Sequence, residues 1–470
     1  MLINQFSRKL SLAFSSVLIL FTSFFAFLST PIADDYCFAL ATAQNKLIEN
    51  TVYYTTQWSP LPVGYLIQNA WWATSKNGAL SSSLITLSAF IIFILSWFIL
   101  FTLFLRRQDR KFVFIMIGIF FSSIALSKTG TFLTYSHPTQ GNYPIIELGK
   151  KILGDLPDGR LSYWYFNTPL ISGRTILIAS ILLMAVLWIL KWNKLTYHLI
   201  FFSLFVATFS LSESLYLGTA LLFYVLVSNK KVKRNLIAYI SIAILVLIPV
   251  LLTLLGASKN RQANLSEFSF ALFTYKTVLI LLYLIASIYL LNTLILGALA
   301  ALVLNRYCSE INFEIVRSLR NLFAVLAISA FLVESAISAY SYSAEYHWTT
   351  LHVFSFLAQF FTVLHRFRGK QLNSSQKYMM TLVSFCVYSA AILLTFQNID
   401  LSNSRVEKWK ERSESSSAQQ TNVRMPIPRV DLRGNPLVGD LDRNYRTIVP
   451  GKGYVSDASY VCFKNLPVGW

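Results

Sequence analysis

Two adjacent carboxylates, Asp34 and Asp35, follow directly on an apolar run from Leu10 to Leu28. Ionised aspartate avoids hydrocarbon, so we expect the pair at the surface of a membrane rather than inside it. A carboxylate at that boundary can act as a general base, taking the proton of a hydroxyl group as the hydroxyl oxygen attacks an electrophile. Asp34 and Asp35 are therefore candidate catalytic residues for general-base chemistry.

Three further acidic residues lie near the same predicted boundary, at Glu213, Glu334 and Glu345. Glu334 stands in FLVESAISAY, where the residues on both sides remain apolar, and an ionisable group at membrane depth is a candidate functional residue. Glu213 in LSESLYLG fits either a functional acid or a solvated turn residue. As a group, these acids are candidates to support the aspartate pair and to hold the molecule that carries the hydroxyl.

Five basic or imidazole residues are predicted on the same face and suit a phosphate group. Arg and Lys side chains bind phosphate oxygens through charge-assisted hydrogen bonds. For each residue alone, contact with a lipid headgroup or with water is the simpler explanation, but external acids combined with external cations favour a site. The predicted phosphate-binding residues are Lys259, Arg261, Arg174, His137 and His347.

Other kinds of site have no signature in this chain. It contains no Gly-rich phosphate loop, no His-Glu-x-x-His motif, no paired Cys-x-x-Cys and no Gly-x-Ser-x-Gly elbow. The five histidines are scattered along the sequence, which disfavours a zinc site. Mg²⁺ or Mn²⁺ remains an open question, because carboxylates near phosphates can bind either ion.

The elements that carry these residues are predicted to be membrane-spanning helices. The chain of 470 residues is 55% hydrophobic and only 13% charged, with a mean hydropathy of +0.54. A span needs roughly 20 mostly apolar residues, and we expect an all-α polytopic membrane protein with about eleven of them. The predicted spans are Leu10–Thr30, Ser81–Leu105, Phe112–Leu126, Thr175–Leu190, Thr196–Ser212, Leu215–Ser228, Leu236–Leu255, Thr277–Leu304, Asn321–Tyr340, Thr349–Leu364 and Tyr378–Phe396.

The distribution of positive charge sets the predicted topology. With the N-terminus in the cytoplasm, nineteen of the 40 Lys and Arg residues fall in short cytoplasmic segments. Thr196–Ser228 is long enough for one helix, but Lys191 and Lys194 before it and four basic residues at 230–234 favour a hairpin of two. The formal charge of +19 therefore reflects membrane topology and does not indicate nucleic-acid binding.

Most of the irregular chain is predicted on the external face. A membrane module of residues 1–396 carries external loops at 31–80, 127–174 and 256–276, and residues 397–470 form an external tail. Loops positioned by a scaffold commonly carry functional sites, so function is expected on that face. Gly64–Thr74 is predicted to lie flat as an interfacial helix, and the tail to form a small β-rich or irregular cap.

Two processing features are predicted at the ends of the chain. The first apolar run exceeds the ~7–15 residues of a signal-peptide core, and Pro31-Ile32-Ala33 is a poor cleavage site, so we expect an uncleaved helix. Cys37 and Cys462 are both predicted to be external, where disulfides form. A Cys37–Cys462 bridge and two unrelated thiols are equally consistent with the sequence.

The layout resembles glycosyltransferase superfamily C, and within it the serotype-converting O-antigen glucosyltransferases. The resemblance covers the whole chain as architecture and rests on three short motifs: ADDYCFA, the KNR of Lys259–Arg261, and VEKWKER after the last predicted span. It implies a bacterial inner-membrane enzyme with its C-terminus in the periplasm. It also implies transfer of a sugar, glucose in that subfamily, from a polyprenyl (undecaprenyl) phosphate donor to a lipid-linked O-antigen or lipopolysaccharide glycan, with inversion.

Three other functions are consistent with parts of the sequence. A lipid-linked glycan transporter or flippase would use Glu213 and Glu334 as proton or substrate groups, although transporters usually place charges near the midplane of the membrane. An O-antigen polymerase or ligase would share the compartment and the lipid-linked substrates. A membrane scaffold without chemistry leaves an acid in a span, at Glu334, without a role.

Overall fold

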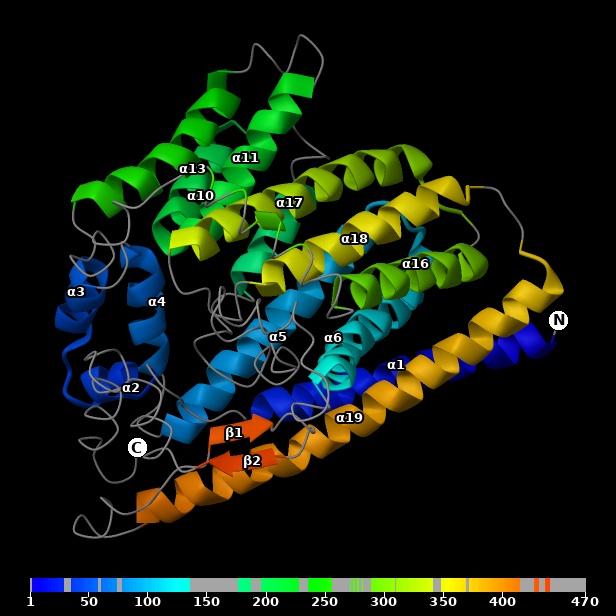
Figure 1. Ribbon diagram of the computed structural model, residues 1–470, viewed down its shortest axis with the longest axis horizontal. Helices are drawn as coiled ribbons and strands as arrows, with labels where there is room; N and C mark the ends of the chain where they lie inside the picture. The colour runs from blue at the N-terminus through cyan, green and yellow to red at the C-terminus, as the bar shows by residue number, and fades with distance from the viewer. Residues whose placement is uncertain are drawn as a thin grey trace.

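A computed structural model of the chain describes residues 2–28, 35–57, 61–73, 78–135, 176–186, 196–227, 236–255, 289–308, 310–340, 348–368, 372–414, 427–430 and 436–439, with isolated positions between 271 and 281. These residues form a bundle of long helices with one small β-hairpin (Figure 1). The helical fold class predicted from the sequence is confirmed. The helices of the first part are α1 (Leu2–Phe27), α2 (Asp35–Ala43), α3 (Leu47–Gln57), α4 (Pro62–Trp72), α5 (Gly78–Thr102), the 3₁₀ helix η1 (Arg107–Phe112) and α6 (Val113–Tyr135).

The second part of the chain continues with helices that overlap the remaining predicted apolar stretches, with different bounds at several ends. A helix at Ile176–Val186 precedes them. They are α10 (Thr196–Phe209), α11 (Leu211–Val227), α13 (Leu236–Leu255), α16 (Tyr289–Tyr307), α17 (Phe313–Tyr340), α18 (Trp348–Arg366) and α19 (Ser374–Glu414).

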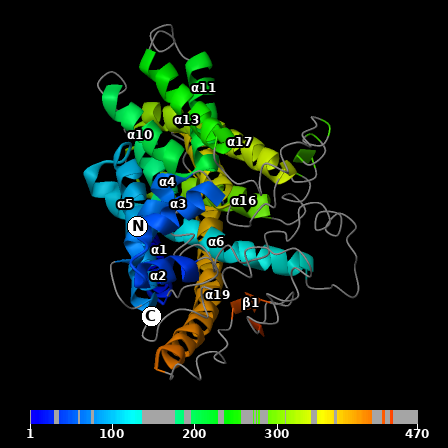
Figure 2. The same ribbon diagram turned by 90° about the vertical axis from the view of Figure 1, so that its left-hand side faces the viewer.

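Within the stretch Thr196–Ser228, which was predicted as a hairpin, the structure has two helices. That they cross a membrane in opposite directions stays a prediction. The α-helix α10 ends at Phe209 and α11 begins at Leu211, and the two helices contact each other on either side of Ser210. Together with α13 they form a group on one side of the molecule, drawn in green in Figures 1 and 2.

Two described helices are long and apolar enough to cross a membrane, at Leu80–Thr102 and Phe313–Ala336. Five shorter apolar helices accompany them: Ile176–Val186, His198–Phe209, Leu211–Phe223, Leu236–Leu252 and Asn292–Tyr307. The number of eleven spans stays a prediction.

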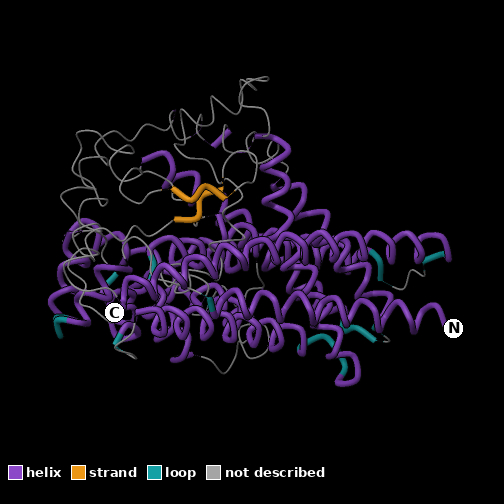
Figure 3. Tube along the Cα trace, turned by 90° about the horizontal axis from the view of Figure 1, so that it is seen from below, coloured by secondary structure: helices purple, strands orange, loops and turns teal. Residues whose placement is uncertain are grey.

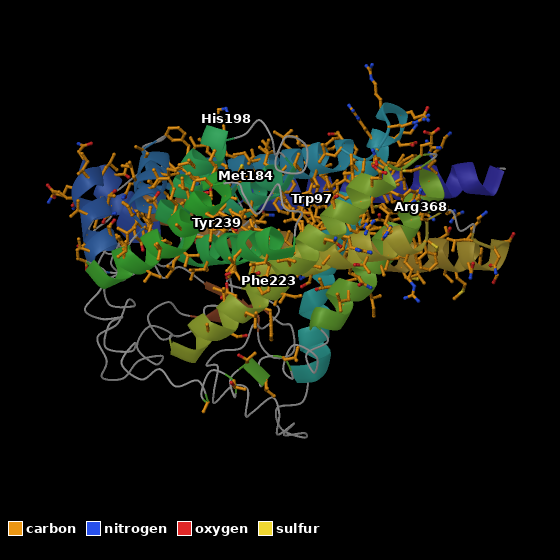
Figure 4. All side chains as sticks on the ribbon, turned by 90° about the horizontal axis from the view of Figure 1, so that it is seen from above. Trp97, Met184, His198, Phe223, Tyr239 and Arg368 are labelled. Atoms are coloured by element: carbon orange, nitrogen blue, oxygen red, sulfur yellow. The ribbon has the colours of Figure 1, made fainter. Side chains whose placement is uncertain are left out.

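Aromatic side chains fill the centre of the bundle, where α5, α6 and α18 meet. The ring of Trp97 lies 4.7 Å from that of Phe120 and 6.0 Å from that of Phe356, between ring centroids. Figure 4 labels Trp97 in this position. Offset and tilted ring pairs at these separations add to the dispersion and apolar burial that hold helices together. The aromatic residues of these apolar stretches thus hold α5, α6 and α18 together.

Two helix pairs approach closely at glycine. A Cβ added to Gly118 of α6 would lie 2.6 Å from Oγ of Ser15 in α1, and one added to Gly297 of α16 would lie 2.7 Å from the carbonyl oxygen of Phe356 in α18. Small residues at such crossings let helix backbones approach in membrane proteins. Ser15 also donates a 2.8 Å hydrogen bond to Tyr388, which ties α1 to α19.

The first predicted loop, 31–80, contains three short helices. Rings from these helices pack together: Phe38 of α2 stacks on Tyr54 of α3 at 4.7 Å between ring centroids, and Tyr54 lies tilted against Tyr65 of α4 at 5.2 Å. The predicted helix at Gly64–Thr74 coincides with most of α4. We call α2, α3 and α4 the α2–α4 unit (residues 35–57 and 62–72), and these described residues form a folded element rather than an irregular loop.

The end of the chain departs from the predicted division at 396/397, because α19 continues without interruption from Ser374 to Glu414. A hairpin of β1 (Ile427–Val430) and β2 (Pro436–Gly439) pairs Ile427 with Gly439 in antiparallel register. Figure 3 shows this hairpin to one side of the helices, and β1 contacts α19. The predicted β content of the tail is confirmed at these eight positions. The second predicted loop likewise begins later than expected, since α6 extends to Tyr135.

Basic residues gather at one end of the bundle, which we call the cationic end. It comprises the start of α1, η1, the end of α16, the start of α17, the end of α18 and the start of α19. Arg8 lies over the ring of Phe112 at 4.3 Å, Arg106 pairs with Glu310, and Arg306 donates to the carbonyl of Lys377 at 2.9 Å. Figure 4 labels Arg368 toward this end. The described basic residues here are Arg8, Lys9, Arg106, Arg107, Arg110, Lys111, Arg306, Arg317, Arg320, Arg366, Arg368 and Lys377.

Candidate functional site

The predicted site residues divide into those that the structure describes and those that lie outside the described residues. Asp35 is the first residue of α2 and Cys37 lies in its first turn; the structure describes the backbone of both residues. Glu213 and Glu334 are described with their side chains. Outside the described residues lie Asp34, Glu345, Lys259, Arg261, Arg174, His137, His347 and Cys462.

Glu213 is a fully buried carboxylate in the first turn of α11. Its Oε2 accepts hydrogen bonds from the hydroxyl groups of Ser210 and Ser212, the latter at 2.7 Å. Its Oε1 accepts a 3.1 Å hydrogen bond from the hydroxyl of Thr350 in α18. The interpretation of Glu213 as a solvated turn residue is therefore wrong, because the side chain is enclosed by protein donors.

The local sequence explains this placement. Ser210 and Glu213 have the Ser-x-x-Glu spacing of a capping box at a helix start, and the N–H of Ser214 donates to the carbonyl of Ser210 at 3.2 Å. The N-terminus of a helix also carries a partial positive charge that favours a carboxylate. Glu213 thus closes the turn between α10 and α11 and ties it to α18.

Glu334 is the second of the predicted site acids whose side chain is described, and it is fully buried near the end of α17. α17 packs on both α11 and α18. The hydrogen bond from Thr350 to Glu213 places the starts of α11 and α18 together, and α17 ends close in sequence to the start of α18. Glu213 and Glu334 accordingly lie toward the same end of these three helices, which we call the acidic end.

The α2–α4 unit contacts the acidic end through α4. A Cβ added to Gly64 would lie 2.7 Å from the carbonyl oxygen of Phe209, the last residue of α10. Ser210, which donates to Glu213, follows Phe209 directly. The helix that begins at Asp35 packs on α4. A continuous chain of contacts therefore connects the element carrying Asp35 to the turn carrying Glu213.

Sequence reasoning missed a second buried polar cluster on α18. His352 is buried and makes hydrogen bonds with Ser123 of α6 at 2.8 Å and with Thr293 of α16 at 3.1 Å. Asn292 donates to the carbonyl of Ser123 at 3.3 Å. The available signal was a histidine in the apolar segment LHVFSF. Thr350 and His352 are two residues apart and so project from roughly opposite sides of α18.

The acidic and cationic ends are separated by the length of α18. Thr350 lies in its first turn and Arg366 is its last residue, and the helical rise between them amounts to about 24 Å. The length of α18 thus separates buried Glu213 from the basic residues of the cationic end. Which compartment each end faces remains a prediction.

A metal and a disulfide find no further support among the residues described. No three His, Cys, Asp or Glu side chains in the described part of the chain are placed to hold a metal ion. Glu213 directs both carboxylate oxygens at protein hydroxyl groups. Cys308 and Cys386 are free thiols, while the predicted Cys37–Cys462 bridge involves a residue outside the described part.

Comparison with models of known protein families, with curated proteins and with solved structures finds no match to this chain. The class of protein therefore rests on the molecule itself: the part of the chain that the structure describes is mainly helical and includes two helices able to cross a membrane.

Proposed function

We propose that this chain is a multi-span membrane protein with its apolar helices in contact with lipid. Large apolar side chains are exposed on many helices, including Leu20 (63%), Phe201 (71%), Leu236 (70%), Ile328 (57%) and Leu393 (66%). Soluble monomers rarely expose contiguous apolar patches of more than a few hundred Å². A hydrocarbon environment accounts for this surface.

The separation of charge favours a single orientation in that membrane. The cationic end faces the cytoplasm, in keeping with the excess of Lys and Arg in cytoplasmic segments. The acidic end and the α2–α4 unit then face the periplasm of a bacterial inner membrane. Cysteines introduced at Lys9 and at Glu49, in a background without native cysteines, should react with an impermeant reagent from opposite sides.

At the acidic end we propose a polyprenyl-phosphate-dependent glycosyltransferase. The observation that carries this proposal is the position of Asp35, at the start of a helix that follows α1 and packs through α4 on the turn of buried Glu213. A polyprenyl donor lies in the bilayer and presents its sugar and phosphate at this depth. An acceptor hydroxyl would meet the carboxylates of Asp34 and Asp35 there.

The chemistry is a direct displacement. Asp34 or Asp35 takes the proton of an acceptor hydroxyl while that oxygen forms a bond to the anomeric carbon of the sugar. The bond from that carbon to the phosphate oxygen breaks, and polyprenyl phosphate leaves with the electron pair. Cations stabilise the charge on the leaving phosphate; Lys259, Arg261, Arg174, His137 and His347 are the candidates. Attack opposite the leaving group inverts the anomeric configuration.

The substrates proposed for this site follow from its location and from the resemblance of the sequence. The donor is a sugar, glucose in the resembling subfamily, on undecaprenyl phosphate. The acceptor is a lipid-linked O-antigen or lipopolysaccharide glycan in the periplasm, and the outcome is serotype conversion. Glu213, Glu334 and Glu345 would support acceptor binding.

Substitution of the aspartates tests the proposal directly. Asp34→Asn and Asp35→Asn should lower transfer of labelled sugar from polyprenyl phosphate by about 10²–10⁴-fold for the residue that is the base, with the other substitution milder. Glu49→Gln, an exposed acid in the α2–α4 unit, is the matched control. Mass spectrometry of surface polysaccharide should show one hexose per repeat gained. Unchanged transfer in both aspartate variants contradicts the assignment.

A lipid-linked glycan transporter is the second candidate, favoured by one observation. Two acids, Glu213 and Glu334, are fully buried on helices that pack together, and transporters use such groups as proton or substrate sites. Movement of labelled lipid-linked glycan across proteoliposomes without covalent transfer would favour transport. Lengthening of glycan chains would instead indicate a polymerase or ligase.

A further inference from the structure

The cationic end contains a cluster of arginines that the proposed chemistry does not use. Arg317 and Arg320 lie in the first turns of α17, and Arg368 follows the end of α18, the helix packed on α17. Arg368 lies over the ring of Phe313, the first residue of α17, at 5.2 Å. Two helix ends therefore bring three guanidinium groups to one place.

These arginines have no described acidic partner. Within the described part of the chain, an ion pair at this end joins Arg106 to Glu310 and so does not involve these three arginines. Arg320 instead donates from Nε and Nη2 to the neutral amide oxygen of Asn321, at 3.0 and 2.8 Å. Guanidinium groups present several donors in a planar fork that matches phosphate. The cluster is thus suited to an anion from outside the protein.

The pKa of His365 shows that the charges of this arginine cluster act on its imidazole. It lies in the last turn of α18, beyond the predicted span, and its Nδ1 is buried without a hydrogen-bond partner among the described residues. Burial, followed by the charges of Arg320, Arg317 and Arg368, lowers the pKa of this imidazole below its usual value of 6.5. All three arginines therefore lie close enough to His365 for their positive charges to oppose its protonation.

The exposed face of α17 indicates what kind of anion fits. Arg317 and Asn321 are exposed near its start, and Ile328 and Leu332 are exposed further along. At 100° per residue these four positions fall within about 60° of one another around the helix. The face is polar at the cationic end and apolar beyond it, which matches a headgroup joined to acyl chains.

The dimensions agree with a lipid. The rise from Arg317 to Ile328 amounts to about 16 Å, close to the roughly 15 Å of hydrocarbon in one leaflet. Basic sites between helix ends on the cytoplasmic side bind anionic headgroups in membrane proteins generally. A free phosphate would use the arginines but would leave the apolar part of this face without a role.

We propose that Arg317, Arg320 and Arg368 form a binding site for the phosphate of an anionic glycerophospholipid, whose acyl chains lie along the exposed face of α17 at Ile328 and Leu332. This inference rests on the membrane placement proposed above and not on glycosyl transfer. The lipid site and the sugar site lie at opposite ends of the bundle, so either can fail alone.

Lipid binding is tested on the full chain purified in mild detergent. Native mass spectrometry with phosphatidylglycerol and with phosphatidylcholine should show retention of phosphatidylglycerol at least tenfold stronger. The triple variant Arg317→Gln/Arg320→Gln/Arg368→Gln should lose that preference, whereas Arg317→Lys should keep most of it. The matched control Arg107→Gln/Arg110→Gln/Lys111→Gln removes equal charge from exposed positions of η1 at the same end and should change retention less than about twofold.

Three outcomes would overturn the proposal. Equal losses in the two triple variants would show diffuse attraction to positive charge instead of a site. Displacement of the lipid by inorganic phosphate at comparable concentration would show a free-anion site. Unchanged retention of the lipid in the variant Arg317→Gln/Arg320→Gln/Arg368→Gln would show that these arginines do not bind it.

Should this triple variant fold poorly, Arg368→Gln alone, with an expected loss of about threefold, gives the same comparison. No sugar donor is needed, so the result does not depend on transferase activity.

Discussion

The hydroxyl of Thr350 donates a 3.1 Å hydrogen bond to Oε1 of Glu213 across 137 positions of sequence. This bond joins the first turn of α18 to the first turn of α11, with both residues buried. It defines one end of the bundle, because the turn between α10 and α11 also receives α4 and thus the α2–α4 unit. A long-range polar contact of this type fixes which helix ends lie together.

Loss of this bond should destabilise the protein without unfolding it. Thr350→Val should lower the free energy of unfolding by about 1 kcal/mol, and Glu213→Ala by about 1–3 kcal/mol, since the latter leaves several buried hydroxyl groups unpaired. Denaturation in mixed micelles measures both. Because the two residues share a bond, the double variant should lose less than the sum. Thr362→Val, at an exposed threonine of the same helix, serves as control, and strict additivity would contradict the shared bond.

The contact of Gly64 with Phe209 leads to a prediction about activity. Gly64→Ala adds a methyl group 2.7 Å from a backbone carbonyl that cannot move aside easily, so α4 and the helix of Asp35 must shift relative to Glu213. Misplacement of a catalytic group by about 1 Å can lower a rate by about 10²-fold. Sugar transfer should fall by at least tenfold.

The control for that prediction is Gly297→Ala, which meets the carbonyl of Phe356 at the same 2.7 Å but joins α16 to α18. Both variants should lower thermal stability, whereas only Gly64→Ala should lower transfer well beyond that effect. If activity and stability fell in parallel in the two variants, the α2–α4 unit would not be part of the site.

The sequence predicts the helices well where apolar runs have clear limits. Leu236–Leu255 agrees with α13 residue for residue, because basic residues precede this run and Gly256 follows it. VEKWKER is itself helix-like in sequence, but apolar runs do not mark where helices that continue into polar residues end. α19 continues through VEKWKER because Glu, Lys and Arg favour helix without any apolar signal, and α6 continues through Ser, Thr and Gly to Tyr135.

The sequence predicts which residue types belong to the candidate site, but it does not predict how they are arranged in space. Glu213 and Glu334 were recognisable because acids in apolar surroundings are conspicuous. The partner of Glu213, Thr350, was not, since a threonine at the start of a helix is common. The cluster of His352 with Ser123 and Thr293 depends on three helices meeting, and no spacing in the chain encodes that meeting.

The approach of α1 to α6 at Gly118 should be sensitive to a single methyl group. Gly118→Ala would place a Cβ 2.7 Å from Cβ and 2.6 Å from Oγ of Ser15, and overpacking of this kind costs about 1–3 kcal/mol. Ser15→Gly in the same chain removes both of these atoms and should restore part of the loss. Thermal unfolding in detergent measures the effect. A double variant less stable than Gly118→Ala by the full effect of Ser15→Gly would show that the two residues do not meet.

His365 should make the stability of the protein depend on pH. Its pKa is lowered in the folded protein, first by burial and then by Arg320, Arg317 and Arg368, from an ordinary value of 6.5. The unfolded chain therefore takes up a proton at higher pH than the folded protein. By linkage, its contribution to stability is fully present above pH 6.5 and is lost as the pH falls from there toward the folded pKa. His365→Gln should flatten this decline between about pH 7 and 5, whereas His198→Gln, at an exposed histidine, should leave it unchanged.

Because a bound anionic lipid offsets the arginine charges, phosphatidylglycerol should weaken the pH dependence of the stability of the wild-type protein. An equal decline in wild-type protein and His365→Gln would show that the arginine cluster does not act on this imidazole.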